Sequence, residues 1–459
     1  MSTAGKTIDI PDLINNNRIG SFQIGMLILC GLCVIMDGFD VQAMGYVAPA
    51  IIADWHVSKA NLGPVFGAGL LGMLVGSLVF SITADKFGRR PVLIGSTIFF
   101  ALCMLVTPLA TSIEQLQLIR FITGLGLGAV MPNAMALAGE YSPLRKKVTL
   151  MMLVSCGFTL GAVLGGLLSA ALIPAFGWQS VFYVGGMVPL VIGVLMFFLL
   201  PESMQFLVLK QRKLEKVAQW LKRIDPTVNI TAETQYVVHE KEHKGAPVLQ
   251  LFTGGRAKMT ILLWVINFMN LLNLYFLSNW LPTIAKEAGL STANAVLAGT
   301  ALQVGGTIGT LVMGQLIDRS SFRRILLPCF LVAAVAIALI GRPDVSLAFL
   351  FITIFIAGFC VVGGQPAVNA LAASYYPTTL RSTGIGWSLG VGRIGSIIGP
   401  VLGGELIRLN WPNSTIFLVV AIPAVVSAAM VFAMRGGPQT AANGKTRPRP
   451  PACTGGARG

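Results

Sequence analysis

The chain contains little charge for its length. Asp, Glu, Lys and Arg make up only 11% of its 459 residues, whereas apolar residues make up 54% and the mean hydropathy is +0.76. Soluble globular domains carry about 25% charged residues, so this composition excludes that class. The chain also has only three histidines, and its seven cysteines lie mostly in apolar stretches, where thiols pack as small hydrophobic groups. We therefore expect no metal and no cofactor.

One motif argues for a metal site. The run His239-Glu240-Lys241-Glu242-His243 fits the H-E-x-x-H motif of zinc proteases. Zinc catalysis needs a third ligand in a shaped cleft, but the flanking residues are charged and His56 is predicted on the other side of the membrane. We interpret the motif as a solvated charge cluster. Since no other catalytic constellation or soluble sensory domain stands out, the sequence favours neither an enzyme nor a receptor.

Long apolar runs take the place of charge. Each is near or above the ~20 residues that cross the hydrocarbon core of a bilayer. The sequence therefore predicts an all-α membrane protein with twelve transmembrane helices, at residues 22–48, 61–83, 92–110, 116–139, 148–172, 179–200, 259–281, 292–317, 325–341, 345–373, 382–407 and 414–434.

Basic residues outnumber acidic ones by 33 to 18, which gives a formal net charge of +15. If the N-terminus is inside, the outer loops hold only four of these 33, and Arg120 and Arg393 fall within spans. This bias follows the positive-inside rule. The charge therefore reflects membrane topology and not nucleic-acid binding, and we predict that both termini are cytoplasmic.

The sequence repeats itself at an offset of 234 residues. Matched residues are Pro132, Ala136, Leu137, Ala138, Tyr141, Pro143, Gly161 and Gly165 with Pro366, Ala370, Leu371, Ala372, Tyr375, Pro377, Gly395 and Gly399. Two homologous six-helix halves around a central cavity are typical of an alternating-access carrier.

The repeat and the polar interval after residue 200 divide the chain. We predict a cytoplasmic N-terminal segment at 1–20, six-helix halves at 21–200 and 258–434, a cytoplasmic linker at 201–257 and a disordered cytoplasmic tail at 435–459. Within the linker, the Lys/Arg-rich amphipathic stretch from Leu207 to Ile224 predicts a helix that lies against the membrane or the bundle mouth.

Two acidic residues interrupt the first apolar run. Asp37 and Asp40 are three residues apart and share one face of the predicted helix. An ionised carboxylate near the bilayer centre costs at least about 2.5–3.5 kcal/mol, so such residues usually have a function. We predict that both form a proton site and that Arg120, at a comparable depth in the fourth span, competes for them. Aspartates that are neutral or paired only for stability are the alternative.

A charged motif connects the second and third spans. The run from Asp85 to Pro91, DKFGRRP, has an echo between the eighth and ninth spans. It resembles the G-x-x-x-D-x-x-G-R-R motif of the major facilitator superfamily, except that Ser81 stands at the first glycine. We predict a cytoplasmic gate of ion pairs, and the alternative is a surface carboxylate at Glu140 beside charge that only sets topology. The gate residues are Asp85, Arg89, Arg90, Glu140 and Asp318.

Further motifs narrow the resemblance. Three of them resemble the aromatic acid:proton symporters: Asp37-Gly38-Phe39-Asp40, Pro201-Glu202-Ser203, and the stretch from Tyr376 to Pro400. The likeness extends from about Ile10 to Met434 and implies the major facilitator fold. It also implies proton-coupled uptake of a hydroxybenzoate-like carboxylate across the bacterial inner membrane. The partners are then a small aromatic acid, protons and the bilayer. We expect the carrier to be a monomer.

The resemblance also implies roles for individual residues and leaves a second reading open. Asp37 and Asp40 match aspartates that the family requires, and the charged residues at Arg120, Glu140 and Arg393 carry over as well. A proton-coupled sugar or polyol symporter of the same superfamily is the alternative, because Arg120-x-x-x-Gly124 and the PES motif occur there too.

Arg393 is the candidate ligand for the substrate carboxylate. A guanidinium in an otherwise uncharged span needs a permanent partner, such as Glu405, or an anion that comes and goes. Guanidinium binds carboxylate in a bidentate geometry, so Arg393 favours an anionic substrate over a neutral sugar. Polar residues of the seventh and tenth spans are further candidates, although each amide can instead bond a neighbouring helix: Asn267, Asn270, Asn273, Tyr275, Gln365 and Asn369.

Overall fold

The computed structural model describes residues 7–228, 230, 234–238, 248–342, 345–376 and 380–434. The H-E-x-x-H motif at 239–243 and the predicted tail at 435–459 lie outside these described residues. Within them the chain is almost entirely helical, and twelve helical segments are long and apolar enough to cross a membrane, which confirms the predicted fold class.

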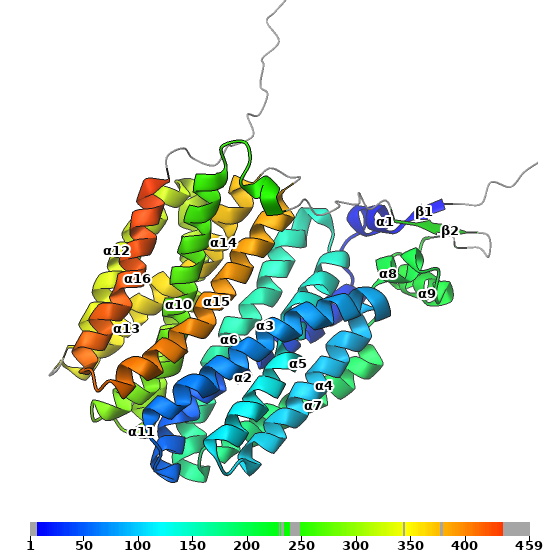
Figure 1. Cartoon of the computed structure of the whole chain (residues 1–459). Helices are drawn as coiled ribbons and strands as arrows, with labels where there is room; N and C mark the ends of the chain where they lie inside the picture. The colour runs from blue at the N-terminus through cyan, green and yellow to red at the C-terminus, as the bar shows by residue number, and fades with distance from the viewer. Residues whose placement is uncertain are drawn as a thin grey trace, which may run out of the picture.

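The spanning helices form two bundles that lie side by side (Figure 1). The first bundle contains α2 (Ser21–Trp55), α3 (Leu62–Phe87), α4 (Arg89–Val106), α5 (Ile113–Glu140), α6 (Leu144–Phe176) and α7 (Gln179–Leu199). The second contains α10 (Ala257–Glu287), α11 (Thr292–Arg319), α12 (Phe322–Ile340), α13 (Leu347–Val361), α14 (Gly364–Tyr375), α15 (Arg381–Arg408) and α16 (Asn413–Ala433).

Serine side chains fix where several of these helices begin. Ser112, Ser291 and Ser346 accept hydrogen bonds from backbone N–H groups three residues further on, at 3.2, 3.2 and 3.3 Å, at the starts of α5, α11 and α13. These bonds satisfy donors that the first helical turn leaves free. The cap residues therefore set the depth at which these spans start.

The tenth span is broken, whereas the sequence predicts one continuous helix at 345–373. The proline at 366 has no N–H to donate to the Val362 carbonyl, and the Gln365 amide takes that carbonyl at 3.3 Å. The chain therefore ends α13 at Val361 and starts α14 at Gly364. The break turns Gln365 toward α10.

The duplication in sequence is also a duplication of helix packing. In the first bundle α3 packs on α5, α2 on α6 and α4 on α7; in the second α11 packs on α13, α10 on α15 and α12 on α16. Glycines allow the same close approach in both. A Cβ at Gly72 or Gly76 would lie 2.1 Å from the carbonyl oxygen of Phe121 or Leu125, and one at Gly305 or Gly309 would lie 2.2 or 2.3 Å from that of Phe355 or Phe359. The residues whose carbonyl oxygens are contacted, Phe121 and Leu125 in one half and Phe355 and Phe359 in the other, are again 234 positions apart.

The two bundles meet through related helices. The α6 helix packs on α11, and α3 packs on α15. Because α15 is the counterpart of α6 and α11 is the counterpart of α3, the two interfaces are equivalent under the duplication. Close contacts lie toward the end where α2 and α10 terminate: Gly45 against Ser278, and Gly63 against Gly404. Lys59 and Glu287 form an ion pair of 2.6 Å at this end, which we call the far end.

Small elements gather at the opposite end of the first bundle, which we call the linker end (Figure 1). Strand β1 (Thr7–Asp9) pairs in parallel with β2 (Gln235–Val237), and α1 (Ile10–Asn16) follows β1 directly. The predicted amphipathic helix is present as two pieces, α8 (Met204–Leu209) and α9 (Leu214–Ile224). The apolar face of α9, formed by Val217, Leu221 and Ile224, is buried in the main hydrophobic core.

Candidate transport site

Asp40 and Arg120 form a buried ion pair between α2 and α5. Arg120 Nη1 lies 2.9 Å from Asp40 Oδ1, and Nη2 lies 3.3 Å from both Oδ2 and the Asp40 carbonyl oxygen. The side chain of Asp40 is 0% exposed and that of Arg120 is 5% exposed. Gly69 of α3 lies beside the guanidinium, and a Cβ there would be in ordinary van der Waals contact with Arg120 Nε at 3.8 Å. Arg120 is therefore committed to Asp40.

Asp37 lies on the same helix, near the middle of α2, and its environment is different. The residue is 1% exposed, and neither carboxylate oxygen has a hydrogen-bond partner among the described residues. Burying an unpaired ionised carboxylate is very costly. The two aspartates, which the sequence treats as one proton site, are thus distinct: one is paired and the other is not.

Arg393 comes from the middle of α15 in the second bundle and approaches Asp37. The guanidinium lies within electrostatic range of Asp37 and of the hydroxyl of Tyr275 on α10. Glu405, the alternative partner considered from sequence, is instead bonded to Arg408 at 2.7 Å and is half exposed. The proposal of a fixed Arg393–Glu405 pair is therefore wrong, since the structure gives that carboxylate to Arg408.

An amide cluster lies between α10 and α14. Gln365 Oε1 accepts from Asn270 at 2.7 Å, and Gln365 Nε2 donates to Asn267 at 2.7 Å and to Asn369 at 3.2 Å. Asn267 also donates to Ser388 of α15 at 2.7 Å. Asn267 and Asn270 are buried, whereas Gln365 and Asn369 are half-buried. The cluster thus offers both donors and acceptors on the second bundle.

Asn273 lies apart from this cluster. With its amide oriented to satisfy both neighbours, it donates to the Val420 carbonyl at 2.8 Å and accepts from the Ala424 amide at 3.3 Å, both on α16. These bonds join two helices of the same bundle, which was the alternative role for the candidate amides.

A cavity of about 20 Å³ beside Arg120 has room for about one water molecule and not for an aromatic acid.

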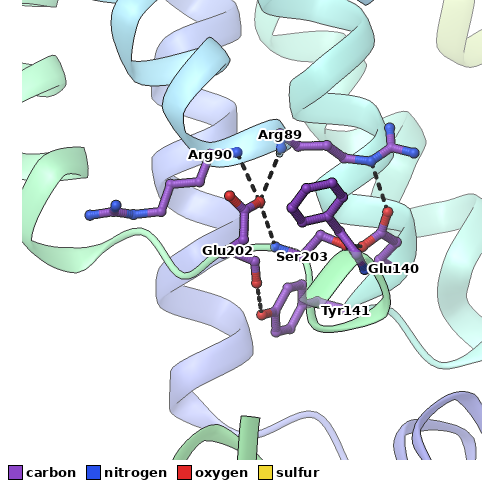
Figure 2. A network of polar contacts seen from close by, with 7 residues as sticks. Arg89, Arg90, Glu140, Tyr141, Glu202 and Ser203 are labelled. Atoms are coloured by element: carbon purple, nitrogen blue, oxygen red, sulfur yellow. Dashed lines mark hydrogen bonds and ion pairs between the residues drawn. The ribbon is translucent and has the colours of Figure 1, made fainter. Parts of the chain in front are cut away.

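A polar network at the linker end joins α4, α5 and the start of the linker (Figure 2). Arg89 Nε lies 2.9 Å from Glu140 Oε1, as predicted for the gate, and Ser203 Oγ donates to the other oxygen of Glu140. Glu202 Oε1 accepts from the backbone N–H groups of Arg89 and Arg90 at 3.0 Å each and from that of Ser203 at 2.9 Å. The Tyr141 hydroxyl donates to the Glu202 carbonyl at 2.6 Å.

Glu202 is the residue that sequence reasoning missed. The PES motif supplied the family resemblance, but a carboxylate in a polar linker carries no pattern of its own that predicts a half-buried network role. Gly88 makes its position possible: at φ 106° it adopts a backbone that favours glycine, and a Cβ there would lie 2.3 Å from Glu202 Oε2. The network lies within the first bundle and its linker.

The other predicted gate residues take different positions. The Arg90 side chain points away from Glu202 (Figure 2), and its guanidinium donates to the carbonyls of Leu200, at 2.7 Å, and Phe197. Asp85 is exposed and forms no ion pair with the part of the chain that the structure describes. The side chain of Asp318 lies outside the described residues.

Burial, together with the charges of Glu140 and Glu202, raises the pKa of Tyr141 well above its ordinary value, so its hydroxyl remains a donor.

The fold and this site, with charges facing each other across two duplicated bundles, define a secondary membrane transporter. The family model described as Major Facilitator Superfamily matches residues 30–241 and 263–456, and the chain belongs to that superfamily.

Among curated relatives, the chain is similar to a 4-hydroxybenzoate transporter of Pseudomonas aeruginosa. The two are 38% identical over 430 residues, which cover 94% of this chain and 96% of the relative. A gallate transporter of Pseudomonas putida is also 38% identical, over 93% of this chain and 95% of the relative. These relatives place the chain in the aromatic acid branch of the superfamily.

Two solved structures share the fold. A bacterial homologue of the human lysosomal transporter Spinster superposes with a TM-score of 0.72 at 18% identity, covering 91% of this chain and 97% of that one. A D-xylose–proton symporter gives 0.70 at 14% identity, covering 91% and 99%.

Proposed function

We propose that this protein takes up an aromatic carboxylate of the hydroxybenzoate type together with protons, by alternating access across the bacterial inner membrane. The observation that carries the proposal is the electrostatic interaction of Arg393 with Asp37, near the middle of two spanning helices from different bundles. One bundle contributes a guanidinium that has no carboxylate hydrogen-bonded to it among the described residues, and the other contributes a carboxylate without a hydrogen bond. The names of the relatives support the substrate class.

Coupling follows from competition for one cation. When the substrate carboxylate binds Arg393 in a bidentate geometry, the guanidinium is neutralised and Asp37 loses its only described opposing charge. A buried carboxylate without a partner is costly in its ionised form, so a proton binds Asp37 along with the anion. Release of the substrate reverses both steps. Arg120, bonded to Asp40, holds α2 and α5 together and does not exchange partners, which revises the competition predicted for it.

The aromatic ring and its hydroxyls require further contacts. We propose that Gln365 and Asn369, the half-buried members of the amide cluster, bond a ring hydroxyl, and that Tyr275 orients Arg393. Asn273 is excluded from this set because both of its hydrogen bonds go to α16. The close contacts at the far end and the Lys59–Glu287 pair correspond to a carrier closed at that end, which we assign to the outside, with both termini in the cytoplasm and a single chain as the working unit.

Uptake of radiolabelled 4-hydroxybenzoate by cells that express the chain tests the function. We expect accumulation that an uncoupler abolishes and that unlabelled substituted benzoates inhibit. A labelled pentose, which a sugar or polyol symporter would accumulate, is expected to remain outside. Accumulation of the pentose but not of the aromatic acid would refute the proposal in favour of a sugar symporter.

A further inference from the structure

A basic pocket lies at the linker end of the first bundle, away from the transport site. Its volume is about 470 Å³, within the usual range for sites that hold small ligands. One wall is α9 with the turn before it, and the other is formed by the ends of α3, α4 and α7. The basic residues that line it are Arg90, Arg212, Lys213, Lys216 and Arg223.

The amphipathic character of α9 explains why these charges converge. Lys213, Lys216, Trp220 and Arg223 recur at helical spacing and line the pocket, while the adjacent apolar face is buried in the core. The preceding turn is strained: Gln211 and Lys213 have φ values of 50° and 48°, a region that non-glycine residues seldom adopt. Such strain persists only where the surrounding structure holds it and is often associated with function. Here it places Arg212 and Lys213 on the wall of the pocket.

These cations have no acidic partners among the described residues. Glu202 also lines the pocket, but one of its oxygens accepts three backbone hydrogen bonds, from Arg89, Arg90 and Ser203. No described acid pairs with Arg212, Lys213, Lys216 or Arg223. A concave site with several unneutralised cations attracts an anion, and phosphate oxygens suit Arg and Lys donors.

The rim of the pocket shows where that anion comes from. Phe87 and Phe198 are 65% and 75% exposed at the ends of spanning helices, where a bilayer would cover them, and Leu199 beside them is 62% exposed. Trp220 contributes an indole ring, a side chain that favours the membrane–water interface. A pocket that is basic inside and apolar at its membrane edge suits a lipid head group whose acyl chains stay in the bilayer.

We propose that this pocket binds the phosphate of an anionic phospholipid from the leaflet at the linker end. Lys213, Lys216 and Arg223 contact the phosphate, Trp220 packs beside the head group, and the acyl chains pass over Phe87 and Phe198. The bound lipid would then hold α8 and α9 against the ends of α4 and α7.

Quenching of Trp220 by brominated lipid tests the proposal on the full chain. The purified carrier is placed in nanodiscs of phosphatidylcholine that contain brominated phosphatidylglycerol or, in parallel, brominated phosphatidylcholine. Subtracting the signal of Trp220→Phe isolates this residue from the other six tryptophans. We expect the phosphatidylglycerol to quench Trp220 preferentially. The triple variant Lys213→Gln, Lys216→Gln, Arg223→Gln should weaken that preference roughly tenfold or more.

A matched triple variant controls for net charge. Lys210→Gln, Lys222→Gln and Lys258→Gln remove the same charge from exposed positions that do not line the pocket, and this variant should keep the preference. Equal loss in both triple variants would show that general surface charge attracts the lipid and would overturn the pocket. Equal quenching by both brominated lipids would overturn an anionic lipid as the ligand.

Discussion

At the scale of single residues, the structure separates two aspartates that sequence alone treats as equivalent. Spacing of three residues correctly places Asp37 and Asp40 on one buried face of α2, and depth correctly brings Arg120 near them. Which aspartate the arginine binds depends on how α2 and α5 pack against each other, which has no sequence signature. Sequence also offered no reason to connect Arg393 with Asp37, because the two belong to different halves.

The first prediction distinguishes the two aspartates. Asp37→Asn should abolish proton-driven accumulation but permit exchange of labelled for unlabelled substrate, because substrate binding at Arg393 remains. Asp40→Asn should also abolish accumulation, and it should lower the stability of the carrier in detergent by about 3–5 kcal/mol, because it leaves Arg120 buried without its counter-charge. Accumulation and counterflow in proteoliposomes, with thermal unfolding in detergent, measure these effects. Normal accumulation by a correctly inserted Asp37→Asn carrier would rule out Asp37 as the proton site.

The second prediction concerns Arg393. Arg393→Lys keeps the charge but loses the bidentate geometry, so the apparent affinity for the aromatic acid should fall by about tenfold or more, while membrane insertion stays normal. Tyr275→Phe is the matched control, because it removes the hydroxyl near the guanidinium without removing charge, and its effect should be smaller. Competition binding of the labelled acid measures both. A variant at Arg393 with wild-type affinity but reduced stability in detergent would assign the residue a structural role.

At the scale of elements, the spans were predictable and the details that place side chains were not. Hydropathy located all twelve spans, since a run of about twenty predominantly apolar residues is characteristic of a transmembrane helix. The break between α13 and α14 depends on a proline whose counterpart, Pro132, lies inside the continuous helix α5. Sequence could not predict which of the two prolines ends its helix, and that break positions Gln365.

The third prediction concerns the network at the start of the linker. Glu202→Gln removes the charge that the N–H groups of Arg89, Arg90 and Ser203 stabilise, so α8 should detach more readily from α4. We expect about 1–3 kcal/mol of lost stability and faster reaction of a cysteine placed at Phe206 with a thiol reagent. Asp85→Asn is the control, because Asp85 is exposed outside the network and should change neither quantity. Unchanged reactivity in Glu202→Gln would show that the carboxylate does not hold the linker.

At the scale of the whole molecule, the structure is closed by contacts at the far end. A lone exposed ion pair contributes only about 0–1 kcal/mol. The Lys59–Glu287 pair therefore shows which end is closed but contributes little to keeping it closed. The glycine contacts between α2 and α10 and between α3 and α15 bring backbones together there. Alternating access requires these contacts to separate.

The fourth prediction tests that requirement. With native cysteines replaced by alanine, Lys59→Cys and Glu287→Cys should be joined by a short bifunctional thiol reagent, because the native side chains meet at 2.6 Å. The joined carrier should lose transport yet still bind the aromatic acid from the linker end. Each single cysteine variant, treated in the same way, should transport normally. Undiminished uptake by fully cross-linked carrier would show that the far end does not open during transport.

The paired interfaces, α6 on α11 and α3 on α15, have a consequence for how the chain is assembled. Each is the counterpart of the other under the duplication, so the two halves recognise one another as two subunits of a symmetric dimer would. The peptide connection between them is then a tether and not a structural necessity. Fragments that end at Val238 and begin at Val248, produced from separate genes in one cell, should reassemble into an active carrier, and co-purification with restored uptake would measure it. Neither fragment should transport alone, because each contains only one of Asp37 and Arg393.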